Sequence, residues 1–188
     1  MHTFPYRGRQ LSNRLKDQFH KLRHESRDLT EHPEQTSQIL LQLKRILPAE
    51  GYLTEKMAQL RAKAHQIRNG HIARLEETGQ VFSKLPVSAK KKAAAELISR
   101  YKQIAGIDTR LERLDKAVAE TERRIKDLTK QAEQYAASYN YRKLDDTLNM
   151  AEKLQNHNSR LLRSIQHTEQ KLSAIAKKVA NEVKQIEK

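Results

Sequence analysis

The last 82 residues of this chain contain neither glycine nor proline, because Gly106 is the final glycine and Pro86 the final proline. Apolar residues recur in this stretch with alternating steps of three and four. That spacing places apolar side chains on one narrow helical face and is typical of coiled coils. With only five glycines and four prolines overall, the chain also lacks the turn residues that a protein of many short strands needs. The sequence therefore predicts an all-α fold.

Two long helices are expected after residue 88. The first has Ser88 as its predicted N-cap, and the apolar rhythm is lost at residues 138–141, where Asn140 is expected to adopt the left-handed conformation that closes a helix. The second is expected over 142–186. Because the two have similar lengths, we predict that they pair as an elongated antiparallel coiled-coil hairpin, with a shorter N-terminal helical segment before it.

The preceding part of the chain is predicted to contain shorter helices. A loose arm over residues 1–8 leads into an amphipathic helix that ends at His32-Pro33, since the residue before proline is disfavoured in the α region. A third helix is expected to begin at Thr54 and to be kinked or split at Asn69-Gly70. The predicted organisation is a basic arm and amphipathic helix (1–32), short helices (33–87) and the hairpin (88–188).

The net charge predicts an anionic partner. The chain has 37 Lys and Arg against 23 Asp and Glu, a formal net charge of +14 and a sequence pI near 10.0. A surplus of this size attracts polyanions, which include nucleic acid, acidic lipid surfaces and acidic proteins. The charge alone does not choose among them.

No residue pattern indicates catalysis. The five glycines are isolated, so the chain has neither the glycine-rich loop of dinucleotide-binding proteins nor a P-loop. The absence of cysteine excludes thiolate chemistry and disulfides. His20 and His24 lie four apart on one predicted helix, but that helix is basic and has no acidic general base. We therefore predict a protein that is not an enzyme and that uses no cofactor and no metal.

A first group of candidate anion-binding residues lies in the basic N-terminal segment. Three interpretations stay open: the arginines contact phosphates, the amphipathic helix lies on an acidic membrane, or its apolar residues pack on the rest of the protein while the charges are solvated. The arginines are Arg7, Arg9, Arg14, Arg23 and Arg27.

A second candidate group is the run Lys90-Lys91-Lys92. Cations in the first turn of a helix oppose the helix dipole, at about 0.3–1 kcal/mol each. Either the helix begins after Lys92, or the three lysines bind an external anion.

The expected tip of the hairpin combines aromatic and basic residues. Such a cluster suits a partner-binding surface or base stacking, and it equally suits closure of the turn. Its members are Tyr135, Tyr139, Tyr141, Arg142 and Lys143.

Asn158 is in phase with the apolar residues Ile165, Leu172 and Val179 of the last helix. A polar residue in such a seam either forms one polar layer or sets the register and the oligomeric state. Both interpretations stay open.

These observations lead to one main functional hypothesis and two alternatives. The chain is expected to be a basic coiled-coil scaffold or accessory subunit, a homodimer or part of a complex, that binds nucleic acid without sequence specificity, or else an acidic protein. The alternatives are a membrane-associated protein with an amphipathic N-terminal helix and a purely protein-binding coiled coil. No apolar run approaches the roughly 20 residues of a membrane span and the first residues resemble no signal peptide, so a cytoplasmic protein is expected.

Overall fold

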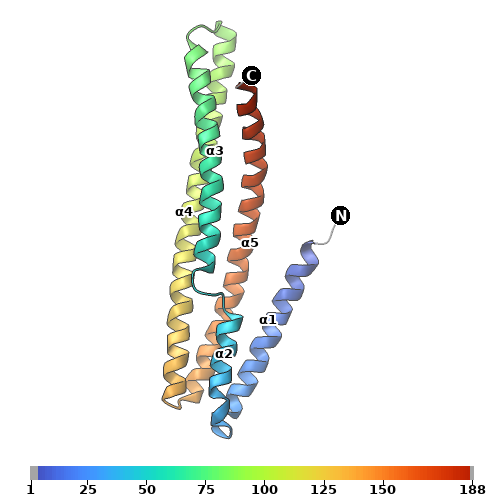
Figure 1. Cartoon of the computed structure of the whole chain (residues 1–188), viewed down its shortest axis with the longest axis vertical. Coiled ribbons are helices and arrows are strands. Elements are labelled where there is room, and N and C mark those ends of the chain that lie inside the picture. The colour runs from blue at the N-terminus through green and yellow to red at the C-terminus, as the bar shows by residue number, and fades with distance from the viewer. Residues whose placement is uncertain (1–3, 187–188) are drawn as a thin grey trace. The chain divides into compact units, whose positions relative to one another are not determined.

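The computed structural model describes residues 4–186, and it describes side chains for residue 14 and for residues 16–185. All regular secondary structure in this part of the chain is helical, which confirms the predicted all-α class (Figure 1). Two 3-10 helices, Asp28–Thr30 and Pro33–Gln35, lie between the first two α-helices. The α-helices are α1 (Phe4–Arg27), α2 (Thr36–Ile46), α3 (Tyr52–Phe82), α4 (Val87–Ala137) and α5 (Tyr141–Ile186).

The ends of α1 show what proline does in each position. The expected loose arm over residues 1–8 is wrong for its described part, because α1 begins at Phe4. Pro5 falls in the first turn, where a missing N–H costs nothing. At the other end, His32 has φ −131° and ψ 65°, outside the α region, so the predicted break before Pro33 is confirmed.

The third and fourth helices begin earlier than their predicted N-caps. Gly51 has φ 79°, and α3 starts immediately after it at Tyr52, so Thr54 lies inside the first turn. The N–H of Thr54 donates to Glu122 Oε1 at 3.1 Å. Likewise α4 starts at Val87, and the carbonyl of Pro86 already accepts the N–H of Lys90 at 2.9 Å. Both N-cap predictions are therefore wrong, because the turn residues Gly51 and Pro86 set the starts.

Gly70 does not break α3, which continues through it to Phe82. A Cβ at this position would collide with Cγ1 of Val179 on α5 and lie 3.5 Å from the Val179 Cβ. The glycine therefore allows close packing between α3 and α5. The predicted split at Asn69-Gly70 is wrong, since this packing compensates the helix-propensity cost of glycine and α3 is one helix from Tyr52 to Phe82, while the predicted kink stays a prediction.

The chain forms two compact units, and both long helices contribute to each. Unit 1 comprises Met1–Thr54 and Ala117–Leu162, and unit 2 comprises Glu55–Lys116 and Arg163–Lys188. Unit 1 thus contains α1, α2, the C-terminal part of α4 and the N-terminal part of α5. Unit 2 contains nearly all of α3, the N-terminal part of α4 and the C-terminal part of α5.

The core of unit 1 draws on all four of its helices. Phe19, Leu22 and Leu29 are almost fully buried, so the apolar face of the N-terminal segment packs within the protein. The other buried members of this core are Ile39, Leu43, Leu47, Leu128, Ala132, Ala136, Leu144, Leu148, Ala151 and Leu154.

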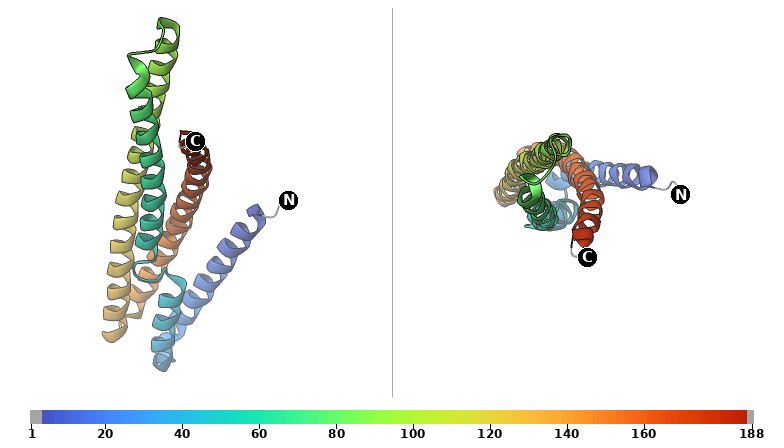
Figure 2. Two further views of the ribbon diagram at one scale, coloured as in Figure 1. Left: turned by 45° about the horizontal axis from the view of Figure 1, so that its top comes forward. Right: turned by 90° about the horizontal axis from the view of Figure 1, so that it is seen from above.

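The core of unit 2 lies among three helices, which run side by side in the views of Figures 1 and 2. The predicted apolar stripes provide it: along most of α3 a buried residue recurs every third or fourth position, and on α4 and α5 buried positions alternate with half-buried ones such as Ile104, Ile107 and Ile175. Its principal buried apolar residues are Met57, Leu60, Ala64, Ile67, Leu111, Leu114, Ile165, Leu172 and Val179.

Candidate anion-binding face

Most of the positive charge belongs to unit 2. Its residues include 20 Lys and Arg and 10 Asp and Glu, for a net charge of +10. Unit 1 has 17 Lys and Arg and 13 Asp and Glu, for a net charge of +4. An anionic partner is therefore attracted chiefly to unit 2.

Within unit 2, the basic residues of α3 are already neutralised by neighbouring carboxylates. Arg61 Nη1 lies 2.7 Å from Asp115 Oδ1, and Lys63 Nζ lies 2.9 Å from Glu169 Oε1. Arg68 pairs with Asp108. These ion pairs join α3 to α4 and α5, and they place Asp108, Asp115 and Glu169 on the side of those two helices that faces α3.

The cations on the opposite side of α4 and α5 have no such partners. Lys102 and Arg113 on α4, and Lys171 and Lys178 on α5, are exposed. None of the four makes an ion pair with any described residue. Part of the uncompensated positive charge of unit 2 thus lies where α4 and α5 meet, while Lys177 and Lys184 of α5 are likewise exposed and form no ion pair with a described residue.

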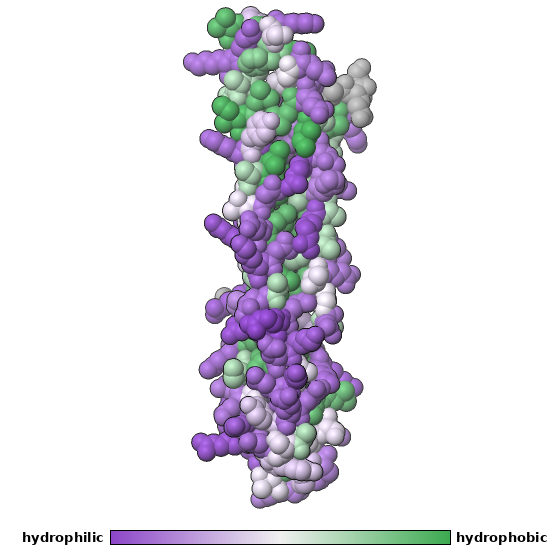
Figure 3. Space-filling model, turned by 90° about the vertical axis from the view of Figure 1, so that its left-hand side faces the viewer, coloured by the Kyte–Doolittle hydropathy of each residue, from purple (hydrophilic) through white to green (hydrophobic). Residues whose placement is uncertain are grey.

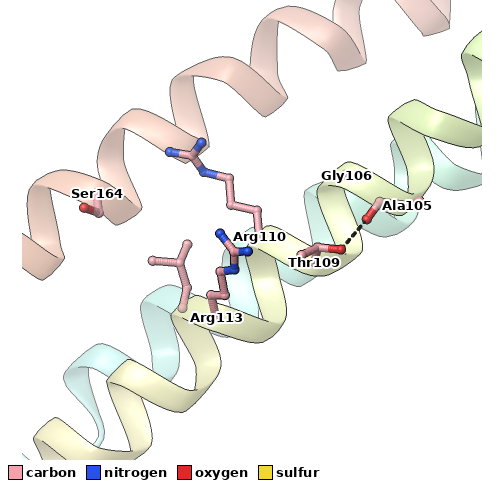
Figure 4. A pocket seen from close by; sticks show the side chains of 7 residues that line it. Ala105, Gly106, Thr109, Arg110, Arg113 and Ser164 are labelled. Carbon is pink, nitrogen blue, oxygen red and sulfur yellow. Dashed lines mark hydrogen bonds between the residues drawn. The ribbon is translucent and has the colours of Figure 1, made fainter.

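A groove between α4 and α5 lies at the centre of this charge (Figure 4). Arg110 reaches across it, donating from Nε to Thr168 Oγ1 of α5 at 2.7 Å, and Arg113 points into it from α4. Small side chains keep the groove open, and no atom lies within 4 Å of a Cβ placed on Gly106. The lining residues are Ala105, Gly106, Thr109, Arg110, Arg113, Leu114 and Ser164.

Helical periodicity extends the groove into a longer basic face. Lys171 and Lys178 follow Ser164 by seven and fourteen residues, so they share its side of α5. Lys102 precedes Arg113 by eleven residues, or about three turns and about 16 Å of α4. We call Lys102, Arg110, Arg113, Lys171 and Lys178 the basic face.

The predicted lysine run lies on the same helix. All three lysines fall inside α4, so the interpretation that the helix begins after Lys92 is wrong. None forms an ion pair with a residue that the structure describes. Lys92 precedes Arg110 by five full turns and Lys91 precedes Lys102 by about three, so these two lie in line with the basic face.

The N-terminal arginines of the prediction have different environments. Arg14 and Arg27 are exposed, whereas the side chains of Arg7 and Arg9 lie outside the described ones. Arg23 has a side chain only 23% exposed, and it lies 3.4 Å from Asp145 and 3.9 Å from Glu152, both on α5. Arg23 therefore joins α1 to α5 within unit 1.

The turn between α4 and α5 is closed by its own residues. Tyr139, not Asn140, has the left-handed conformation (φ 55°), so that detail of the prediction is wrong. The Asn140 N–H donates to Tyr135 O at 2.9 Å, as in a Schellman motif, and Asn140 Oδ1 caps α5 by accepting the Lys143 N–H at 3.3 Å. Asn140 is thus the N-cap of α5.

The aromatic cluster of the tip is only partly exposed. Tyr135 and Tyr141 pack against the core of unit 1, while Tyr139 is 74% exposed. The Tyr139 and Tyr141 rings meet edge to face at 6.4 Å, and Lys143 Nζ lies 5.6 Å from the Tyr135 ring centre. Arg142 is exposed. These contacts account for turn closure and leave Tyr139 and Arg142 accessible.

A buried polar network in unit 2 has no counterpart in the sequence prediction. The guanidinium of Arg100, which is 8% exposed, lies 2.7 Å from Glu182 Oε2 and 3.0 Å from both Glu96 Oε1 and His71 Nδ1. Because Arg100 donates to Nδ1, the proton of neutral His71 is on Nε2, which is buried without a partner. Burial, reinforced by the charge of Arg100, lowers the pKa of His71.

No group of three or more His, Asp or Glu side chains among the described residues is placed to hold a metal ion. None of the described helices has the length and apolar character needed to cross a membrane.

No known protein family, curated protein or solved structure matches this chain. The fold and charge therefore define it only as a basic, all-α helical protein.

Proposed function

We propose that this chain is a non-enzymatic helical scaffold that holds the phosphate backbone of nucleic acid on the basic face of unit 2, without reading the bases. The observation that carries the proposal is the separation of charge in this unit. The cations of α3 are paired with carboxylates, while those of the basic face are exposed and unpaired among the described residues, apart from the Arg110 bond to Thr168.

The dimensions of the basic face suit a polyanion better than a single small anion. Lys102 and Arg113 are about 16 Å apart along α4, whereas duplex DNA carries one negative charge per about 1.7 Å of its axis. Several phosphates would therefore lie within reach of its five cations at the same time. Long flexible lysines contact phosphates without geometric selectivity, which favours binding independent of sequence.

We further propose that α4 and α5 pair along their apolar seams as the predicted antiparallel coiled-coil hairpin. The buried residues Leu111, Leu114, Leu161 and Ile165 keep the three-and-four spacing that such a seam needs. In this arrangement the hairpin is the rigid support of the basic face. Its assembly as a homodimer or within a larger complex, and its cytoplasmic location, stay predictions.

The test is binding of labelled duplex DNA and single-stranded RNA by fluorescence anisotropy, in salt from about 50 to 200 mM, where phosphate contacts give a linear log-log dependence. The variant is the triple substitution Arg113→Glu, Lys171→Glu and Lys178→Glu. Losing three phosphate contacts should reduce the salt slope by about 2.7 and weaken binding at least about tenfold at the lower salt.

A matched control makes the same change of net charge in unit 1. Arg45, Lys126 and Lys130 are exposed and form no ion pair with a described residue. Replacing these three by glutamate should change the salt slope by no more than about 0.9, the value of a single phosphate contact on duplex DNA. If both triple variants lose affinity equally, the partner responds to net charge and not to the basic face.

The lysine run is tested separately. Replacing Lys90, Lys91 and Lys92 by glutamate should weaken binding while the helicity measured by circular dichroism is unchanged. Unchanged affinity would remove these lysines from the proposed contact surface.

A further inference from the structure

A second surface of unit 2 is apolar and lies on the other flank of α4. Ile98 and Tyr101 of α4 are 56% and 65% exposed, and Ile72 of α3 is 41% exposed. Ile72 and Tyr101 also line a hollow between α3 and α4, together with Leu75 and Ile104. We call these four residues, together with the neighbouring Ile98, which does not line the hollow itself, the apolar groove.

The groove arises because unit 2 has only three helices around its core. The apolar stripe of α4 is wider here than α3 and α5 cover, so Tyr101 extends it toward solvent beside α3, and Ile98, three residues earlier, lies on the exposed side of α4. Figure 3 shows green apolar side chains gathered in its upper part, at the height of the turn between α3 and α4. Contiguous exposed apolar residues of this kind mark interaction sites in proteins.

The charges around the groove indicate which kind of partner fits it. Lys90 and Lys91 precede the apolar positions Ile98, Tyr101 and Ile104 of α4, and Lys102 lies between the last two. None of the three lysines pairs with a described carboxylate. Arg68, which also lines the hollow, is neutralised by Asp108, and Glu76 is the single acidic residue in the lining. A second copy of this chain would bring another unit of net charge +10 to this surface, so self-association is electrostatically disfavoured.

We propose that the apolar groove docks one amphipathic helix of an acidic partner protein, which becomes the fourth helix of unit 2. The apolar face of that helix would cover Ile72, Ile98 and Tyr101. Its glutamates and aspartates would lie beside Lys91 and Lys102 at the rim. This is the helix-in-groove mode of recognition, with apolar anchors at i, i+3, i+4 and i+7.

The α4 part of the groove accommodates the central anchors of such a helix. From Ile98 to Ile104, α4 covers about 9 Å, or nearly two turns. This surface differs from the basic face, because Tyr101 and Ile104 are on the α3 side of α4 while Arg110 and Arg113 line the groove beside α5. Lys91 and Lys102 lie beside both surfaces, so each surface is tested with substitutions that leave these two lysines in place.

The probe is a fluorescent helical peptide of about 20 residues with leucine at helical spacing and glutamate and alanine elsewhere. Its counterpart has lysine in place of glutamate. The acidic peptide should bind in 100 mM salt, and the lysine counterpart should bind at least about tenfold more weakly because it meets like charge at the rim. Equal binding of both peptides would overturn the charge argument.

The variant for this test is Ile98→Gln with Tyr101→Gln. Both side chains are mostly exposed, so the fold should persist, which circular dichroism checks. The double variant should weaken binding of the acidic peptide at least about tenfold, because the central apolar anchors dominate such interfaces. Its affinity for duplex DNA should stay within about twofold, since the basic face is intact.

The matched control replaces two exposed apolar residues of unit 1, Leu41 and Met150, by glutamine; they are 50% and 53% exposed. This control should bind the peptide as the original does. Equal loss in both double variants, or no binding of the acidic peptide by the original protein, overturns the proposal. Two other results would also overturn the proposal, because each would show a different occupant of the groove. They are concentration-dependent self-association of the original protein, or its sedimentation with acidic vesicles, if the Ile98→Gln, Tyr101→Gln variant loses that behaviour.

Discussion

Replacing glycine by alanine at Gly70 and at Gly106 should have different effects on stability. Both residues lie inside helices of unit 2, where alanine is intrinsically favoured over glycine by about 1 kcal/mol. At Gly106 nothing lies within 4 Å of the new Cβ, so Gly106→Ala should raise the free energy of unfolding by about 1 kcal/mol. The surroundings of Gly70 cancel or reverse this gain in the free energy of unfolding.

The Cβ of Gly70→Ala would collide with Cγ1 of Val179. Valine is stiff about χ1, and Val179 is only 4% exposed, so its methyl group cannot move into solvent. Overpacking of this kind costs about 1–3 kcal/mol, which offsets or exceeds the helix-propensity gain. Gly70→Ala should therefore be less stable than Gly106→Ala by about 1–3 kcal/mol, the cost of the collision alone.

Urea unfolding followed by circular dichroism measures both variants. A double-mutant cycle identifies the cause, because in the Val179→Ala background the collision is absent and Gly70→Ala should then gain about 1 kcal/mol. If Gly70→Ala and Gly106→Ala raise stability equally in the original background, α3 and α5 do not approach each other closely at this position.

Two further predictions concern buried polar residues. The lowered pKa of His71 means that the unfolded chain binds a proton more readily than the folded chain. The contribution of His71 to the free energy of unfolding should therefore be fully present above about pH 6.5 and should fall as the pH drops below that value. Unfolding free energies at pH 7.5 and 5.5 should differ less in His71→Gln, and an identical pH dependence would contradict the role of His71. Asn158 is fully buried and neither of its side-chain amide atoms has a partner, so Asn158→Leu should stabilise the protein by about 1–3 kcal/mol in thermal or urea unfolding. A loss of stability, or a change of oligomeric state in sedimentation, would favour the interpretation that Asn158 sets the register.

Single residues determine where the helices are interrupted, but the role of each residue within the turn depends on its neighbours. Pro33 ends the first helical segment as predicted, because the steric restriction on His32 is local. Asn140 is placed correctly at the turn, yet it caps α5 while Tyr139 takes the left-handed conformation. Helix starts were harder to predict, since the competition between Thr54 and Gly51, or between Ser88 and Pro86, is decided by turn geometry.

The sequence by itself determined the helical class and the faces that become buried. Leu144, Leu148, Ala151 and Leu154 are buried as their spacing predicts, because helical periodicity is a property of consecutive residues. The net charge, and with it the attraction for an anion, is likewise a sum over residues.

Only the tertiary structure decided which charges are free and which apolar residues stay uncovered. Arg61 and Arg113 are both arginines on basic helices, yet Asp115 neutralises the first while the second points into an open groove. The sequence alone predicts a helix break at Gly70, whereas the position of Val179 on α5 shows that the glycine makes room for close packing. Sequence periodicity assigns each residue to a face of its own helix, whereas ion pairs, close approaches and grooves depend on which helix lies opposite that face.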